Sequence, residues 1–193
     1  MKIPLMLRFI VSNIIDISDY SPKQSDSFFF DNNIWIYLLY PLSRFDKKQQ
    51  KVYSSFLSQM LSARSTVFVN SLVLSEFINL CLRFDYNQWK RNPENISNGS
   101  DYKRNYLGCS SYKKEIENIT TIVGKILKLS EKFPDNFTSI DIGSVLNNLK
   151  LIDFNDSYYI ELFKNKDIKI VTHDADFFNQ RFEVDILTAN RNY

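Results

Sequence analysis

The stretch Phe28-Phe29-Phe30-Asp31-Asn32-Asn33-Ile34-Trp35 begins with three aromatic residues that end directly at a carboxylate. Two later runs, Thr66-Val67-Phe68-Val69 and Ile168-Lys169-Ile170-Val171-Thr172, share this short, apolar character with β-branched or aromatic residues. Runs of this kind are typical of buried strands. Because longer segments with a helical spacing of apolar residues separate them, the sequence predicts an α/β protein with a parallel sheet.

Helices are predicted where apolar residues recur at helical spacing or follow a capping residue. These segments are 34–40, 46–64, 72–84, 116–127, 138–149 and 156–164, and a fourth strand is predicted at 184–187. We expect Ser71 to cap the helix that follows the second strand. Either Asp153 or Asn155 is expected to cap the helix over 156–164.

The beginning and the middle of the chain suggest additions to this sheet. Residues 1–27 are interpreted as an N-terminal extension, with an added edge strand over 7–11 and a linker over 16–26. The early apolar run over residues 3–7 is far too short to span a membrane. Over about 85–115 the helical pattern gives way to polar, aromatic and basic residues, which predicts an insertion in a main domain over 28–193.

Composition excludes several kinds of site. One histidine and two cysteines are too few for a structural zinc site, and the absence of a disulfide framework favours a reducing, cytoplasmic setting. The four glycines form neither a dinucleotide-binding pattern nor a P-loop. Carboxylates are plentiful, since the 193 residues include 22 acidic and 24 basic side chains. Chemistry in this chain is therefore expected to depend on acids and a hard metal ion.

Four carboxylates lie where the predicted fold can bring them together. Asp31 follows the first strand directly, and Asp174 comes two residues after the third. Glu76 and Asp156 lie in the opening turns of helices that begin near the same edge of the sheet. Each acid alone also fits a helix cap or a turn. Because sites in open parallel sheets form beyond the carboxyl ends of the strands, the combination predicts one acidic crevice.

Four segments together resemble a PIN domain, the fold of VapC-like toxin ribonucleases. They are Phe30-Asp31-Asn32-Asn33-Ile34-Trp35, Ser75-Glu76-Phe77-Ile78-Asn79, Asn155-Asp156-Ser157 and Thr172-His173-Asp174-Ala175-Asp176-Phe177. The resemblance spans about residues 28–187. It implies a PIN-like three-layer α/β/α fold with a central, mostly parallel sheet of four to five strands.

The resemblance also implies roles for particular residues. The metal-site and catalytic acids are expected to be Asp31, Glu76, Asp156 and Asp174, with Asn33 and Thr172 as supporting residues. Asp176 either supports the site from behind these acids or belongs to a turn. His173 occupies a free position of the motif and is expected to be a surface or turn residue.

The implied reaction is hydrolysis of RNA that leaves a 5′-phosphate. Two carboxylates about 4 Å apart repel by ~4 kcal/mol at an effective dielectric constant of about 20, so several in one cleft need protons or a cation. Mg²⁺ or Mn²⁺ suits an all-oxygen site and can supply an activated water. We expect Asp31 and Asp174 to bind the ion directly, and Glu76 and Asp156 to act through water or as the base.

The predicted insertion over about 85–115 is basic and rich in aromatic residues. Its cations Lys90, Arg91, Lys103 and Arg104 can hold phosphates while neighbouring rings stack on unpaired bases. Two other interpretations stay open. The segment can be a solvated loop whose aromatic residues pack on the helices, or it can be a docking site for a protein.

Three functions are compatible with these residues. The first is a Mg²⁺- or Mn²⁺-dependent ribonuclease, with a small antitoxin protein and a homodimer as further expectations of the resemblance. The second is a non-catalytic PIN-fold module that binds RNA or protein. The third, phosphoryl transfer through an aspartyl intermediate, needs a second aspartate two residues after the nucleophile, where this chain has Asn33.

Overall fold

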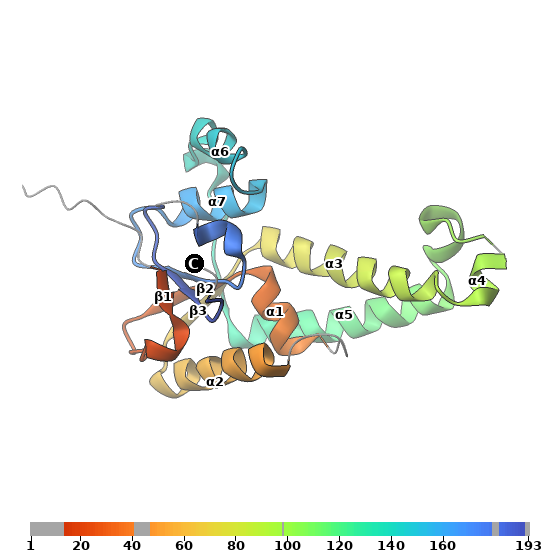
Figure 1. Cartoon of the computed structure of the whole chain (residues 1–193), viewed down its shortest axis with the longest axis horizontal. Coiled ribbons are helices and arrows are strands. Elements are labelled where there is room, and N and C mark those ends of the chain that lie inside the picture. Colours follow the sequence, from red (N-terminus) through yellow and green to blue (C-terminus); the bar gives the residue numbers. More distant parts are fainter. Residues whose placement is uncertain (1–13, 41–46, 98, 179–181, 192–193) are drawn as a thin grey trace, which may run out of the picture.

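A single parallel sheet organises the computed structural model, which describes residues 14–40, 47–97, 99–178 and 182–191. Within these ranges six strands pair in the order β1-β6-β5-β2-β3-β4 (Figure 1). The strands are β1 (Ile14–Asp16), β2 (Ser27–Phe30), β3 (Thr66–Val69), β4 (Glu131–Lys132), β5 (Lys169–Val171) and β6 (Ile186–Thr188). The predicted α/β class and parallel sheet are therefore confirmed, but the sheet has six strands where four to five were expected.

The two edges of the sheet differ from what the sequence predicted. The strand expected over residues 7–11 lies outside the described residues, and the N-terminal strand within them is β1, which pairs with β6. The expected linker over 16–26 opens with a 3-10 helix, Ile17–Asp19. At the other edge, β4 pairs with Phe68 and Val69 of β3. It consists of two exposed charged residues, which explains why no apolar pattern revealed it.

Helices cover the two faces of the sheet (Figure 1). They are α1 (Asn32–Leu39), α2 (Lys47–Ala63), α3 (Ser71–Trp89), α4 (Pro93–Ser97), α5 (Ser110–Leu129), α6 (Ile142–Asn148) and α7 (Phe154–Phe163). In Figure 1, α6 and α7 lie on one side of β2 and β3, and α1 and α2 lie on the other. No helix in the described ranges is both long and apolar enough to cross a membrane.

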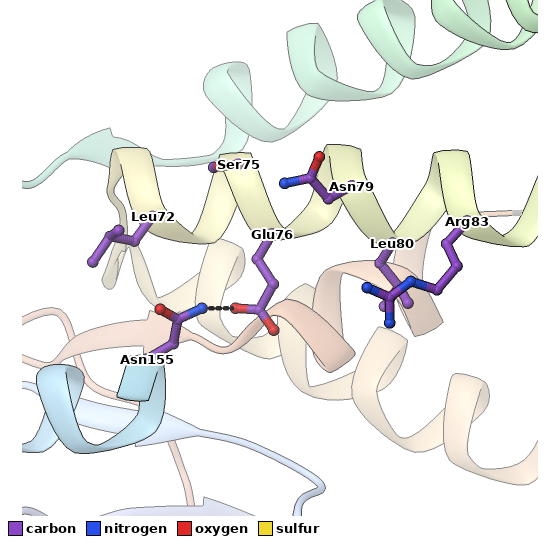
Figure 2. Close-up of a pocket in the computed structure, with 7 residues that line it drawn as sticks. All are labelled: Leu72, Ser75, Glu76, Asn79, Leu80, Arg83 and Asn155. Carbon is purple, nitrogen blue, oxygen red and sulfur yellow. Dashed lines mark hydrogen bonds between the residues drawn. The ribbon is translucent and has the colours of Figure 1, made fainter. Parts of the chain in front are cut away.

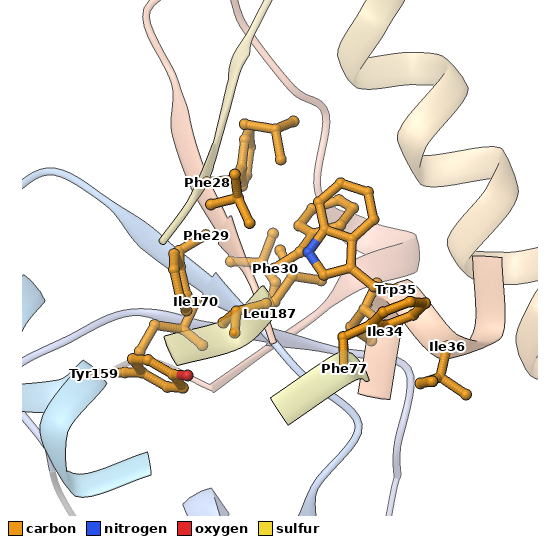
Figure 3. Close-up of a cluster of buried hydrophobic side chains, with 14 of the residues drawn as sticks. Phe28, Phe29, Phe30, Ile34, Trp35, Ile36, Phe77, Tyr159, Ile170 and Leu187 are labelled. Atoms are coloured by element: carbon orange, nitrogen blue, oxygen red, sulfur yellow. The ribbon is translucent and has the colours of Figure 1, made fainter. Parts of the chain in front are cut away.

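The aromatic run of β2 forms the centre of the core (Figure 3). Because successive strand residues point to opposite faces, Phe28 packs on Phe56 of α2, with ring centroids 5.6 Å apart, while Phe29 packs on Phe163 of α7 at 4.6 Å. Phe30 is also fully buried. Burying each ring contributes about 1.5–3 kcal/mol, so this one strand fixes helices on both faces.

Strand register places the ends of β2 and β5 side by side. Phe30 pairs with Val171, and the Asp31 N–H donates to the Val171 carbonyl at 3.0 Å. Both strands end at this point, so the residues that follow them, Asp31 and Thr172, meet at the carboxyl edge of the sheet. The sequence predicted this edge as the location of the site.

One predicted helix cap is wrong. The side chain of Asn70, and not that of Ser71, caps α3, since Asn70 Oδ1 accepts a hydrogen bond of 3.0 Å from the Val73 N–H. Ser71 is the first helical residue, and its hydroxyl donates to Asp135 at 2.5 Å. Asn70 directly follows β3, so its buried amide begins α3 at the same edge as Asp31.

The helices α3 and α5 pack on each other and extend away from the sheet as a long arm (Figure 1). The helix end predicted at residue 84 is wrong, because α3 continues to Trp89. Likewise, α5 begins at Ser110, before the apolar pattern starts. The partner side chains here are polar: Asp85 accepts hydrogen bonds from Tyr106 at 2.7 Å and from Ser111 at 3.4 Å. Apolar periodicity therefore does not reveal this part of the arm.

Candidate metal centre

Asp31 is the most constrained acid at the carboxyl edge. It is 5% exposed and caps α1, and its carboxylate accepts hydrogen bonds from the Asn32 N–H and Asn33 Nδ2 at 2.5 Å each and from Thr172 Oγ1 at 2.7 Å. Burial, together with the charges of Glu76 and Asp174, raises the pKa of Asp31 to about 7, against the lowering effect of the hydrogen bonds from Thr172 and the Asn32 N–H. A folded protein that buries this carboxylate favours its protonation unless a cation is bound.

The residues Thr172, Asn33 and Asp174 form one hydrogen-bonded loop around Asp31. Thr172 Oγ1 accepts from the Asp174 N–H and from Asn33 Nδ2, both at 3.0 Å, while it donates to Asp31. Asn33 Oδ1 in turn accepts from the His173 N–H at 3.1 Å. This loop explains why a hydroxyl and an amide occupy these positions: each both donates and accepts. The expected supporting residues thus contact the acid they were expected to support.

Asp176 lies at the end of this loop. It is exposed, and its backbone N–H donates to Asp174 Oδ1 at 2.9 Å in the short helix Ala175–Phe178. Its backbone orients the Asp174 carboxylate, and no hydrogen bond from its side chain is present among the described residues. The turn alternative for Asp176 is therefore the one that the geometry favours.

Two helices bring the other two acids to the same place. Glu76 of α3 is partly buried and accepts a hydrogen bond of 3.0 Å from Asn155 Nδ2 on α7 (Figure 2). Asp156 is 7% exposed in the first turn of α7, where Asp153 is the helix cap and accepts from the Asp156 N–H at 2.9 Å. Burial raises the pKa of Glu76 and, with the charge of Asp31 as the next cause, raises that of Asp156 to about 9.

These pKa effects show that the four acids share one electrostatic environment. Asp31, Asp153, Asp174 and Glu76 each raise the pKa of Asp156, and Asp174 also raises that of Glu76. The fold therefore brings together acids that are more than a hundred residues apart in the chain. A neighbouring groove of about 320 Å³, lined by Glu76 and Asn155 among others, opens the site to solvent along α3 (Figure 2).

The donor set fits a hard divalent cation. Among the described residues, no group of three or more acidic, histidine or cysteine side chains is arranged to hold an ion. Mg²⁺, however, is usually bound through one or two carboxylates and keeps several waters. The Asn32 amide, which hydrogen bonds to Glu76, also has a buried Oδ1 without a hydrogen-bond partner in the described part of the chain. A cation or one of its waters would satisfy this oxygen.

Asn32 and Asn155 are two residues of the site that sequence reasoning missed. Asn155 was expected only as a helix cap, whereas its amide holds Glu76. Both asparagines stand directly beside an acid, Asn32 after Asp31 and Asn155 before Asp156. An asparagine next to a predicted site acid was the one indication of these roles in the sequence. The sequence does not, however, reveal the direction in which an amide side chain points.

The four cations of the predicted insertion lie on the arm. Lys90, Arg91, Lys103 and Arg104 are all exposed, and the Lys90 ammonium lies 5.2 Å from the centre of the Tyr86 ring. Figure 1 shows α4, which follows Arg91, at the end of the arm that is far from the sheet. These residues are therefore not adjacent to the acids, and their contact with RNA stays a prediction.

The aromatic residues of the arm pack on one another. Tyr106 is fully buried, and its ring lies 5.2–5.5 Å from the rings of Tyr86, Trp89, Tyr102 and Tyr112. The Tyr106 hydroxyl is held by Asp85. A buried ring cannot stack on a base, so the geometry favours the packing interpretation for Tyr106, whereas the four rings around it are partly exposed.

The fold and the site define an α/β/α protein that carries buried carboxylates at the carboxyl edge of a parallel sheet. The chain belongs to the PIN domain family, whose model matches residues 28–183. PIN domains are generally metal-dependent nucleases. The resemblance found in the sequence is therefore confirmed.

A solved structure shows the same fold. A chain in the crystal structure of VapBC2 from Rickettsia felis, bound to a DNA fragment from their promoter, aligns with a TM-score of 0.50. The two chains are 13% identical, and the alignment covers 83% of this chain and 97% of that one. No sequence among the curated proteins matches significantly.

Proposed function

We propose that the protein is a Mg²⁺- or Mn²⁺-dependent endoribonuclease that hydrolyses RNA phosphodiester bonds. The observation that carries the proposal is the burial of Asp31 and Asp156 within each other's electrostatic influence at the carboxyl edge of the sheet. Ionising both carboxyls costs free energy unless a cation is bound between or beside them. Membership of the PIN domain family supports the same metal-dependent hydrolysis.

Each acid has a role that follows from its surroundings. Asp31 and Asp174 would hold the ion, because the Thr172 hydroxyl donates to the Asp31 carboxylate and accepts from the backbone N–H of Asp174, which ties the two residues together at the edge of the sheet. A bound divalent cation supplies positive charge for the phosphate and acidifies a water. Glu76 would act through water, since the Asn155 amide already occupies one of its oxygens. Burial and the neighbouring acids raise the pKa of Asp156 to about 9, so this carboxyl is protonated at neutral pH without a cation. A bound cation would favour its ionised form, which could then take up the proton of the attacking water.

Incubation with a mixed RNA pool tests this proposal. We expect cleavage with Mg²⁺ or Mn²⁺, none with a chelator, and a loss of at least about a hundredfold in Asp31→Asn and in Asp174→Asn. Asp167→Asn is the matched control, because Asp167 is 90% exposed at the opposite end of β5. Products should carry a 5′-phosphate. Cleavage that survives both site variants would overturn the proposal.

A non-catalytic PIN-fold module is the second candidate function. The exposed cations Lys90, Arg91, Lys103 and Arg104 of the arm favour it, since a surface that holds phosphates needs no metal. In that case the protein would bind RNA or a protein without cleaving RNA under any metal condition. The same incubation, run beside an RNA-binding assay, separates the two candidates.

We also propose a small antitoxin protein as a partner. The support is the likeness in fold to a chain of the VapBC2 structure together with family membership. Coexpression with the product of a small adjacent open reading frame should yield a complex and suppress RNA cleavage. Copurification without suppression would contradict the antitoxin role. The homodimer and the cytoplasmic location stay predictions.

A further inference from the structure

A second polar pocket lies beside the candidate metal centre. Its volume is about 350 Å³, and it is lined by Lys48 of α2, His173, Asn190, Arg191 and Asp16, among others. Two of these side chains are permanent cations and one is a carboxylate. The pocket is therefore positive where the neighbouring acidic site is negative.

Parallel topology puts this pocket at the same edge of the sheet as the acids. Asp16 ends β1, Ala189 follows the end of β6, and His173 lies two residues after the end of β5. These three strands are neighbours in the sheet, and β2, which ends before Asp31, is next in order. A strand of RNA that crosses the acidic site can therefore continue over the pocket.

Hydrogen bonds fix the pocket to the acidic site. The His173 carbonyl accepts from Asn190 Nδ2 at 2.9 Å, and the His173 N–H donates to Asn33 Oδ1 in the acidic site at 3.1 Å. The Tyr53 hydroxyl connects two residues that line the pocket. It lies 2.9 Å from His173 Nδ1 and accepts a hydrogen bond of 3.0 Å from the Ala189 N–H. The backbone of His173 therefore bonds to the acidic site through its N–H and to the pocket through its carbonyl.

The two cations suit a phosphate group. Arg191 Nε donates to Asp16 Oδ2 at 3.1 Å, which orients the guanidinium while its other N–H donors have no partner among the described residues. A guanidinium presents its donors as a planar fork that matches phosphate oxygens, and a lysine adds a flexible point charge. Lys48 is exposed on α2 and lines the pocket.

We propose that this pocket binds a phosphate of single-stranded RNA that neighbours the scissile one, with Lys48 and Arg191 as the groups that hold it. The inference rests on the proposed function in that it takes RNA as the substrate. Arg191 and Asp16 lie outside the matched family segment 28–183, whereas Lys48 and His173 lie inside it. The pocket anchors the substrate where the acids alone would repel it.

Binding of a short, fluorescein-labelled, single-stranded RNA in chelator tests the proposal without cleavage. In fluorescence anisotropy, we expect the double variant Lys48→Gln/Arg191→Gln to bind about tenfold more weakly than the unmodified protein. The slope of log affinity against log salt should fall by about 0.7 for each lost phosphate contact. Lys48→Arg/Arg191→Lys, which keeps both charges, should retain most of the affinity.

The matched control is Arg64→Gln/Lys128→Gln. Those two cations line a pocket of about 280 Å³ where β3 and β4 begin, at the opposite edge of the sheet. The control removes the same charge and should leave both affinity and salt slope unchanged. Equal losses of RNA affinity in the two double variants, or no loss of affinity in the Lys48/Arg191 double variant, would overturn the proposal. If the Lys48/Arg191 double variant has a lowered melting temperature, the single variants Lys48→Gln and Lys128→Gln are compared in its place.

The outcomes also separate this inference from the proposed function. Suppose that the Lys48/Arg191 double variant alone loses RNA affinity, and that the unmodified protein cleaves no RNA with either metal. This outcome supports the phosphate-binding pocket and refutes the nuclease. Suppose instead that the unmodified protein cleaves RNA with metal, and that the Lys48/Arg191 double variant binds RNA as tightly as the unmodified protein. This outcome supports the nuclease and refutes the phosphate-binding pocket.

Discussion

Mg²⁺ or Mn²⁺ should raise the melting temperature far more at about pH 8 than at about pH 5.5. Asp31 and Asp156, whose pKa values are raised from 3.8 to about 7 and about 9, bind protons more tightly in the folded protein than in the unfolded chain. At a pH between about 4 and these raised pKa values, the folded protein holds protons that the unfolded chain releases. The free energy of unfolding therefore falls as the pH rises through this range. A cation that binds the ionised carboxylates reverses this loss.

The burial of Asp31 sets the pH dependence, and the metal concentration sets the size of the rise. A rise of its pKa from 3.8 to about 7 makes full ionisation in the folded state cost about 4 kcal/mol. A metal at about 100 times its dissociation constant stabilises the folded state by about 2.7 kcal/mol. Since 1 kcal/mol shifts the melting temperature of a chain of this size by about 2–4 °C, we expect a rise of about 5–10 °C at about pH 8. Protonated carboxyls bind metal weakly, so the rise should nearly vanish at about pH 5.5.

Thermal unfolding followed by circular dichroism measures these shifts in chelator and in each metal. Asp31→Asn keeps a side-chain oxygen that can cap α1 but removes the charge that a cation needs. This variant should lose most of the metal-dependent rise. Asp167→Asn removes a charge at the other end of β5 and should keep the whole rise.

Two results would refute the reasoning. An equal metal-dependent rise at both pH values, or in both variants, would mean that the ion binds away from the buried carboxylates. A melting temperature in chelator that climbs from about pH 5.5 to about pH 8 would contradict the raised pKa values directly.

Three further changes test contacts around the site and in the arm. Thr172→Val removes the hydroxyl that donates to Asp31, so the initial rate of RNA cleavage should fall at least about tenfold, whereas Thr172→Ser should retain it. Tyr53→Phe leaves a backbone N–H without its hydroxyl acceptor and should lower the free energy of unfolding by about 1–3 kcal/mol in urea denaturation. Tyr106→Phe removes the donor to Asp85 and should cost about 1 kcal/mol in the same measurement while cleavage stays unchanged.

The sheet and its acidic edge were predictable because each depends on local pattern. Three aromatic residues before Asp31 fix a buried strand, and a carboxylate that ends a buried strand in a parallel sheet faces its carboxyl edge. Glu76 and Asp156 were predictable for a related reason, since helices that follow or precede such strands begin near that edge. The direction of the asparagine amides beside these acids has no local signature, which is why the contact between Asn155 and Glu76 was missed.

The arm was not predictable from apolar spacing because its contacts are made by polar and aromatic groups. Asp85 would interrupt an amphipathic pattern, yet it sits within α3 with the hydroxyls of Tyr106 and Ser111 on its carboxylate. Composition alone showed that this segment is rich in aromatic and basic residues. Only the fold shows that the rings contact each other and leave the charges exposed.

Strand order explains why the phosphate pocket is invisible in the sequence. Asp16 and Arg191 lie 175 positions apart, and they meet only because β1 pairs with β6. If β1 added to the β4 edge instead, Asp16 would lie at the far end of the sheet from His173, and the pocket would not exist. Spacing along the chain fixes which residues end a strand, but the order of strands fixes which of those residues are neighbours. A substrate subsite built from three strand ends therefore depends on topology, whereas the acid that caps α1 depends on sequence alone.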